Sequence, residues 1–213
     1  MIPEPGSGRD GGEGVPGVTR VEAFSDGVIA IIITIMVLEL KAPEEPGLRH
    51  LLPLWPIMIA YALSFAYIGI YWANHHRLFS HATKVTNGLI WWNLLLLFSL
   101  SLIPFATAYL GQQHFTRDAT LLYLAVMTVP AVTYPMLQRV IRHTGTRSER
   151  AAEYHRRTIR KGLVTNVILL AGFPLTFLSP WLGIGTAVLV AILWFLPSSP
   201  LDRVFSGSGH GAA

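Results

Sequence analysis

The sequence has 213 residues, of which 52% are hydrophobic and only 13% are charged. Soluble globular chains carry about 25% charged residues, and the charges here fall in clusters separated by long uncharged stretches, as expected of a membrane protein. None of the residues is cysteine, which excludes disulfide bonds, thiolate metal sites and cysteine nucleophiles. The net charge is +4, and the basic residues lie beside apolar segments, which indicates a role in membrane topology rather than nucleic-acid binding.

The chain divides by composition into two tails and one apolar domain. We expect residues 1–18 to form a disordered tail, because they are rich in Gly and Pro and contain no apolar run. They also lack the basic start and apolar middle of a secretory signal. Residues 19–197 are expected to form a single transmembrane domain, and residues 198–213, which are rich in Ser and Gly, a flexible C-terminal tail.

Two apolar segments follow the first tail. A spanning helix needs about 20 mostly apolar residues. Residues 21–40 meet this requirement with three acidic residues as their only charges. Residues 51–74 are uncharged, and their two prolines lie in the first turns, where proline is best tolerated.

Four further spans are predicted in the second part of the chain. Residues 89–110 form the third span, with a kink expected at Pro104, and residues 119–138 form the fourth, with bends at two internal prolines. The uncharged residues 162–201 are long enough for two spans, with a turn at Ser179 and Pro180. The sixth span, near residues 181–196, is short and is also compatible with an interfacial segment.

The distribution of Lys and Arg predicts that both termini lie in the cytoplasm. With that orientation thirteen basic residues are cytoplasmic and three are outside, in agreement with the positive-inside rule. Eight of the thirteen lie in the fourth connection, residues 139–161. This connection could also be read as a nucleic-acid patch, but stacking aromatic residues are nearly absent from it. We therefore interpret it as a determinant of topology that contacts anionic lipid.

The first span carries an acidic residue at membrane depth, which costs at least about 2.5 kcal/mol at the bilayer centre. Asp26 therefore requires a partner. The second span returns to the same side of the membrane, so Ser25 and Asp26 are predicted to hydrogen-bond with the residues at its end. Those residues are Asn74, His75, His76 and Arg77, and Arg20 is a further candidate for the network. The alternative is that Asp26 only caps the helix.

A metal site and a catalytic site are both disfavoured. Adjacent residues such as His75 and His76 do not share a helix face, whereas helical metal pairs are three or four residues apart. No Ser/His pair at a shared depth, aspartate dyad or zinc motif is apparent, so we predict neither an enzyme nor a cofactor. A secondary transporter remains an alternative, although the prolines show no repeat between two halves. A proton pathway through Asp26 and either histidine is a second alternative.

An apolar stripe follows Asp26 on the first span. Ile31, Ile35 and Leu38 share one side of the helix, with Thr34 beside them. Around an axis formed by several copies, this stripe would make apolar rings that gate by dewetting and a hydroxyl ring that replaces part of an ion's hydration shell. The alternative is that the stripe faces lipid or core and that the Thr34 hydroxyl bonds a carbonyl of its own helix.

The start of this span resembles a known family signature. The heptapeptide Arg-Val-Glu-Ala-Phe-Ser-Asp, residues 20–26, is similar to the Arg-x-x-x-Phe-Ser-Asp motif of the prokaryotic transmembrane protein 175 family, relatives of the lysosomal potassium channel of that name. The fixed positions of the motif fall on Arg20, Phe24, Ser25 and Asp26. The sequence His-His-Arg-Leu-Phe, which ends at Phe79, resembles the end of the family's second helix, and the six-span plan fits residues 19–197.

The resemblance implies an all-α, polytopic cell-membrane protein with six transmembrane helices, four copies of which line a pore with their first helices. It also implies permeation of potassium in preference to sodium, without the Thr-Val-Gly-Tyr-Gly filter, a segment that the sequence lacks. The implied partners are potassium ions, the lipid bilayer and further copies of the chain, with no nucleic acid. The isoleucine constriction of the family falls on Ile31, its threonine layer on Thr34, and its further apolar layers on Ile35 and Leu38. Some members have serine just before the constriction, where this sequence has Ala30, which removes an oxygen ligand below the gate.

Overall fold

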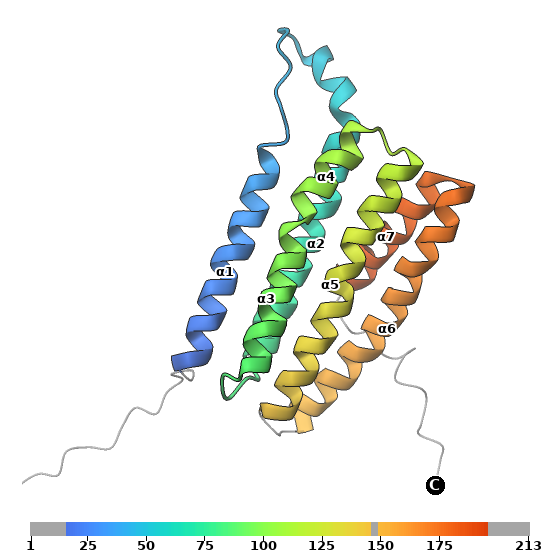
Figure 1. Ribbon diagram of the computed structural model, residues 1–213. Coiled ribbons are helices and arrows are strands. Elements are labelled where there is room, and N and C mark those ends of the chain that lie inside the picture. The colour runs from blue at the N-terminus through green and yellow to red at the C-terminus, as the bar shows by residue number, and fades with distance from the viewer. Residues whose placement is uncertain (1–15, 146–148, 196–213) are drawn as a thin grey trace, which may run out of the picture.

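The computed structural model describes residues 16–145 and 149–195, and all the regular secondary structure in these ranges is helical. The long helices lie side by side in one bundle (Figure 1). In chain order the elements are α1 Pro16–Val37, the 3₁₀ helix η1 Leu48–Leu54, α2 Trp55–Phe79, α3 Asn87–Ser101, α4 Ile103–Gln112, α5 Arg117–Thr144, α6 Glu149–Leu178 and α7 Pro180–Phe195. The tails predicted at residues 1–18 and 198–213 lie outside the described residues, except for residues 16–18, which belong to α1.

Four helical segments are long and apolar enough to cross a bilayer. They are Leu48–Phe79, Asn87–Gln112, Arg117–Thr144 and His155–Leu178. The 16 residues of α7 are apolar but extend only about 24 Å, less than the roughly 30 Å of a hydrocarbon core. The 22 residues of α1 are long enough to span, but three charged residues, Arg20, Glu22 and Asp26, lie in its first half. The turn between α6 and α7 lies at Ser179, as the sequence predicts.

The third predicted span consists of two consecutive helices, α3 and α4. The interruption lies at Leu102, and Pro104 occupies the first turn of α4, where its missing N–H group leaves no hydrogen bond unmade. The hydroxyls of Ser99 and Ser101 donate to the carbonyls of Leu96 and Phe98, at 2.6 and 2.7 Å. Proline and these local hydrogen bonds together account for the break near the predicted kink.

The basic connection between the fourth and fifth predicted spans is largely helical. α5 continues to Thr144 and α6 begins at Glu149, so only a short segment separates them. Arg, Lys and Glu are good helix formers, and the ion pair between Glu153 and Arg157 has the favourable i, i+4 order. The helices therefore extend beyond their apolar portions at this end of the bundle.

Two glycines allow α6 and α7 to pack closely. A Cβ atom at Gly172 would clash with the Thr186 hydroxyl, and one at Gly183 would clash with the Thr176 hydroxyl. Each hydroxyl donates to a carbonyl of its own helix, Thr176 to Gly172 and Thr186 to Gly183, both at 2.7 Å. Small residues at such contacts are characteristic of membrane helix pairs, because they allow the backbones to approach closely.

Replacing Gly183 with Leu is expected to lower the free energy of unfolding by about 1–3 kcal/mol, the usual effect of overpacking a close contact. The matched control is Gly185→Leu on the same helix, because nothing lies within 4 Å of a Cβ atom built there. Unfolding in mixed micelles followed by circular dichroism measures both variants. Equal stability of the two variants would contradict the close packing of α6 and α7.

Candidate functional site

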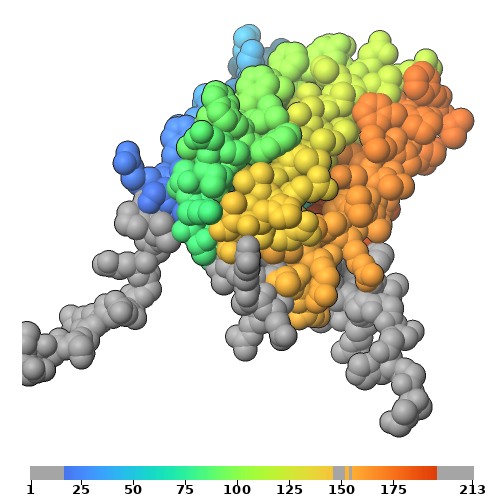
Figure 2. Space-filling view, turned by 60° about the horizontal axis from the view of Figure 1, so that its bottom comes forward, coloured from blue at the N-terminus to red at the C-terminus, as the bar shows by residue number. Residues whose placement is uncertain are grey.

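α1 lies at the edge of the bundle and packs against α2, α3 and α4 (Figures 1 and 2). The side chains that face the bundle are buried and recur every three, four or seven residues, as expected of one helix face. They are Val18, Ser25, Ile29, Ile32 and Met36. Most of the buried face is apolar, so van der Waals packing holds most of α1, and the polar Ser25 marks the section where hydrogen bonds are made.

The opposite side of α1 is uncovered and carries the stripe singled out in the sequence. Ile31, Ile35 and Leu38 are 58%, 44% and 73% exposed. Leu38 follows the last residue of α1, and its N–H group still bonds the Ile35 carbonyl at 3.0 Å. The Thr34 side chain is also exposed, and its hydroxyl lies 3.0 Å from the Ala30 carbonyl oxygen and 2.9 Å from that of Ile31.

An open groove of about 750 Å³ runs beside this stripe, between α1 and the α3–α4 segment. Ile31 and Ile35 line its α1 side, and Phe105 and Ala108 of α4 line the other. Phe105 is 63% exposed. The apolar surface of α1 therefore continues across the groove onto α4.

A chain of hydrogen bonds joins α1 to α3 and α2. Asn93 of α3 donates from Nδ2 to Ser25 Oγ at 2.8 Å, and its Oδ1 lies 2.8 Å from His75 Nε2. The Ser25 hydroxyl donates to the Val21 carbonyl at 2.8 Å. Since the Asn93 oxygen can only accept, His75 must donate from Nε2, and the donors then run in one direction from α2 to α1. Ser25, His75 and Asn93 are at most 1% exposed.

Two further contacts hold α1 in register with α2. Trp72 donates from its indole N–H to Asp26 Oδ1 at 3.0 Å, and Glu22 Oε1 lies 2.9 Å from His76 Nδ1. The partners are spaced four residues apart on each helix and run in opposite order, as required for antiparallel neighbours. Asp26 therefore binds α2 through Trp72, and the acidic residues of the first helical turns are matched to donors on α2.

The remaining residues predicted for the network lie elsewhere. Asn74 donates to the Ile70 carbonyl at 2.8 Å, and its own carbonyl accepts from Tyr134 at 3.1 Å, so it contacts α5 rather than α1. Arg20, Phe24 and Arg77 are exposed. Within the described residues the structure shows no hydrogen bond or ion pair from the side chains of Arg20 and Arg77.

Sequence reasoning missed Trp72 and Asn93, two residues that hydrogen-bond directly to α1. Asn93 had a signal, because it is a single amide within the uncharged third span, where an unpaired amide is unfavourable. Trp72 lies one helical turn before His76, on the same face of α2, and the two rings stack with centroids 6.2 Å apart. In residues 16–145 and 149–195 no group of three or more His, Cys, Asp and Glu side chains is arranged to hold a metal ion.

Residues 20–104 match the family described as "Endosomal/lysosomal potassium channel TMEM175". The matched range includes α1 from Arg20 onward and the residues of α2 and α3 that hydrogen-bond to it. A protein from Chryseobacterium sp. strain P1-3 that is named a potassium channel is 42% identical over 185 residues, which are 86% of this chain and 95% of that protein. The chain belongs to the TMEM175 family.

Two further comparisons extend the similarity to the remaining helices. A protein from Chamaesiphon minutus that is named a potassium channel is 35% identical over 194 residues, 84% of this chain and 94% of that protein. The crystal structure of a lysosomal potassium-selective channel TMEM175 homologue from Chamaesiphon minutus superposes with a TM-score of 0.76 at 32% identity, over 87% of this chain and 100% of that one. Members of the TMEM175 family are ion channels rather than enzymes, and with several apolar helices this chain is membrane-embedded.

Proposed function

We propose that this TMEM175-family chain is a potassium-selective cation channel of the cell membrane, in which four copies surround a pore lined by α1. The observation that carries the proposal is the uncovered side of α1, where an apolar stripe and one hydroxyl lie opposite the face that packs on the bundle. Arg20 is exposed near the start of α1, and a charged side chain suits contact with water better than contact with lipid.

The apolar stripe can act as a gate that needs no charged group. Ile31, Ile35 and Leu38 recur at intervals of four and three residues, so four copies around an axis form stacked apolar rings. A narrow apolar ring excludes water and ions until it widens, so such a ring can close a pore by dewetting. In this arrangement Ile31 forms the constriction and the other two residues form further layers.

Thr34 supplies the oxygen atoms of the proposed pore. Its hydroxyl hydrogen is directed to a carbonyl of its own helix, which leaves the lone pairs of Oγ1 available on an exposed side chain. Four such hydroxyls replace part of the hydration shell of a passing cation. Potassium holds its water less tightly than sodium and therefore passes the apolar constriction more readily. Ala30 adds no ligand at the neighbouring position.

The hydrogen-bond network gives α1 a fixed rotation about its own axis. Contacts at Glu22, Ser25 and Asp26 all lie in the first three turns and hold one side of α1 against α2 and α3. The stripe, which begins about one and a half turns after Asp26, is then directed away from the subunit's own core. In our proposal the network is therefore a positioning device for the pore-lining residues.

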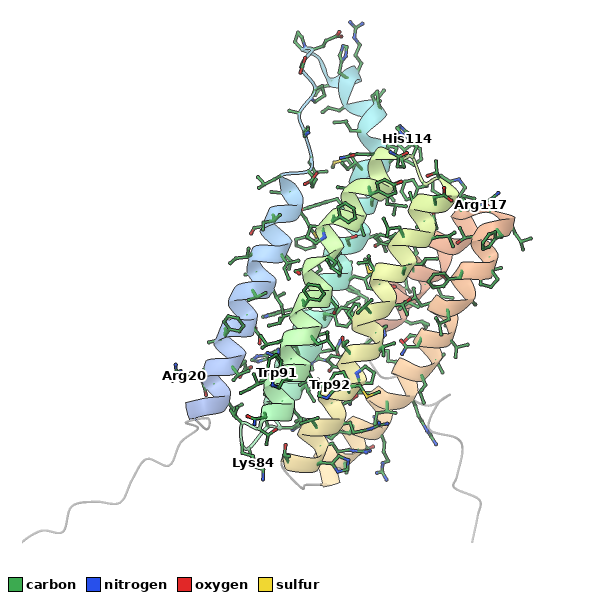
Figure 3. All side chains as sticks on the ribbon, in the orientation of Figure 1. Arg20, Lys84, Trp91, Trp92, His114 and Arg117 are labelled. Atoms are coloured by element: carbon green, nitrogen blue, oxygen red, sulfur yellow. The ribbon has the colours of Figure 1, made fainter. Side chains whose placement is uncertain are left out.

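We propose six spans, including α1 and α7, with both termini in the cytoplasm. The start of α1 and the α2–α3 connection lie at the same end of the bundle, as the labelled Arg20 and Lys84 indicate, whereas His114 and Arg117 lie at the other (Figure 3). The basic helix extensions of α5 and α6 lie at the same end of the bundle as the α2–α3 connection (Figure 1). This grouping of basic residues supports the orientation expected from the positive-inside rule.

The proposed layer at Thr34 is tested by reversal potentials of purified protein in planar bilayers. The wild type is expected to conduct potassium in preference to sodium. Thr34→Ala is expected to lower the potassium-to-sodium permeability ratio about threefold to tenfold, equivalent to about 0.6–1.4 kcal/mol. The matched control is Thr128→Ala on α5, whose hydroxyl makes the same bond to its own helix, at 2.7 Å to Leu124. Absence of potassium current in the wild type would contradict the proposed channel function. An unchanged potassium-to-sodium permeability ratio in Thr34→Ala would contradict the placement of Thr34 in the pore.

A further inference from the structure

A second cavity lies within the subunit, away from α1. It has a volume of about 410 Å³ and is lined by residues of α2, α5, α6 and α7. This volume is within the range of roughly 300–1,000 Å³ typical of ligand sites. It lies in the half of the bundle that carries the basic extensions of α5 and α6, the end that faces the viewer in Figure 2.

The lining of the cavity changes from apolar to basic along its length. Leu169 and Val190 are buried residues of its inner part, and Arg139 and Arg142 line it near the end of α5. The two arginines are three residues apart and therefore share one face of that helix. Tyr71 of α2 also lines the cavity.

The sequence explains why this space is not filled. Gly162 lines the cavity, and nothing lies within 4 Å of a Cβ atom built on it. Pro135 lacks the N–H group that would bond the Ala131 carbonyl, and Asn166 of α6 donates to that carbonyl instead, at 3.0 Å. The α5 backbone is thus satisfied by a side chain, which holds α5 and α6 together beside an open space.

We propose that this cavity binds an anionic membrane lipid, with its phosphate at Arg139 and Arg142 and an acyl chain between α2 and α6. The guanidinium fork matches phosphate oxygens in a bidentate manner, and the apolar inner wall matches a hydrocarbon chain. Basic pockets between membrane helices on the cytoplasmic side are known sites for anionic lipid headgroups. The cavity combines these features within one subunit.

The cavity lies beside the part of α2 that holds α1, so a bound lipid could affect α1 through α2. Tyr71 and Asn74 of α2 line the cavity, whereas Trp72, His75 and His76 make the contacts that hold α1. A lipid in the cavity would therefore contact the stretch of α2 that carries the network residues. The proposed lipid binding does not depend on the proposed channel function. Only an effect of the lipid on ion current would rest on that function.

Trp194 provides a direct measure of occupancy. It lines the cavity, its indole N–H donates to Thr165 Oγ1 at 3.2 Å, and its ring is therefore held in place. Bromine atoms on an acyl chain quench a nearby tryptophan. The full-length protein is reconstituted in phosphatidylcholine vesicles with increasing brominated phosphatidylglycerol or brominated phosphatidylcholine. The difference between the wild type and Trp194→Phe isolates the signal of Trp194.

We expect Trp194 to be quenched at lower concentrations of the brominated anionic lipid than of the neutral one. The double variant R139Q and R142Q is expected to raise the half-quenching concentration of the anionic lipid about tenfold. The control double variant K84Q and R156Q removes the same charge from residues that do not line the cavity, and we expect it to behave as the wild type. Equal quenching by both lipids, or an equal loss in both double variants, would overturn the proposal.

A cavity-filling substitution tests the acyl chain. Gly162→Leu extends a side chain into open space and favours the helix, so it is not expected to impair folding. It is expected to abolish the saturable part of Trp194 quenching, whereas Gly185→Leu outside the cavity leaves it unchanged. Unaltered quenching in Gly162→Leu would place the acyl chain elsewhere and contradict the proposal. The measurement requires no ion flux, so it remains informative even if the chain conducts no potassium.

Discussion

Ile31→Asn is expected to raise sodium flux about tenfold and to reduce the preference for potassium. In the proposed pore the side chain forms the narrowest apolar ring, and an amide in its place keeps the ring hydrated. A tenfold increase in flux requires the barrier to fall by about 1.4 kcal/mol, a modest change for an apolar constriction that becomes polar. Reversal potentials and unitary conductances in bilayers with opposing potassium and sodium solutions measure both effects.

The control for this substitution is Ile192→Asn on α7. Ile192 is 50% exposed, close to the 58% of Ile31, so the two substitutions place an amide on similarly exposed positions of different helices. Only Ile31→Asn is expected to alter permeation. If both variants retained the selectivity and conductance of the wild type, Ile31 would not lie at the constriction.

Asn93→Leu is expected to destabilise the subunit by about 2 kcal/mol and to loosen α1. The substitution roughly preserves side-chain volume but leaves Ser25 Oγ without its donor and His75 Nε2 without its acceptor, both in buried positions. An unsatisfied buried polar group costs about 1–3 kcal/mol, although hydrogen bonds between membrane helices have averaged about 0.6 kcal/mol. Unfolding in mixed micelles measures the stability, and limited proteolysis after residue 37 measures the release of α1.

Asn87→Leu is the matched control, because Asn87 lies exposed at the start of the same helix. It is expected to leave stability nearly unchanged and α1 protected. If both the stability and the proteolysis rate of Asn93→Leu equalled those of the control, the role of the network would be contradicted. Faster proteolysis without loss of stability in the rest of the bundle would instead indicate that Asn93 acts on α1 alone.

The helices could be predicted because apolar length is a property of the sequence itself. Long uncharged runs specify spans in lipid irrespective of their neighbours, so the second to fifth spans and the turn at Ser179 correspond to helices and a break in the structure. The helical state of residues 139–144 and 149–161 was missed. Clustered basic residues suggested a connection, but lysine and arginine are also good helix formers once an adjoining span nucleates the helix.

For contacts between helices, the sequence predicted only which residues lie at the same depth in the membrane. Topology brings the end of α2 beside Ser25, but it does not fix the rotation of either helix, and rotation selects His75, His76 and Trp72 rather than Asn74 and Arg77. Asn93 enters because α3 packs against the same face of α1, a relation between three helices that no single span encodes. The assembly of several copies is a further level, and only the family resemblance implied it.

Cysteine substitution at the stripe tests the central claim most directly, because none of the 213 residues is cysteine and every introduced thiol is unique. Leu38→Cys, studied with Val167→Cys on the exposed side of α6 as the control, is treated with a water-soluble thiol reagent during current recording and with a mild oxidant before denaturing electrophoresis. If α1 lines a shared pore, the reagent blocks the current through Leu38→Cys, and oxidation links its subunits in pairs, whereas Val167→Cys is unaffected. Unchanged current together with unlinked subunits in Leu38→Cys would contradict a pore formed by α1.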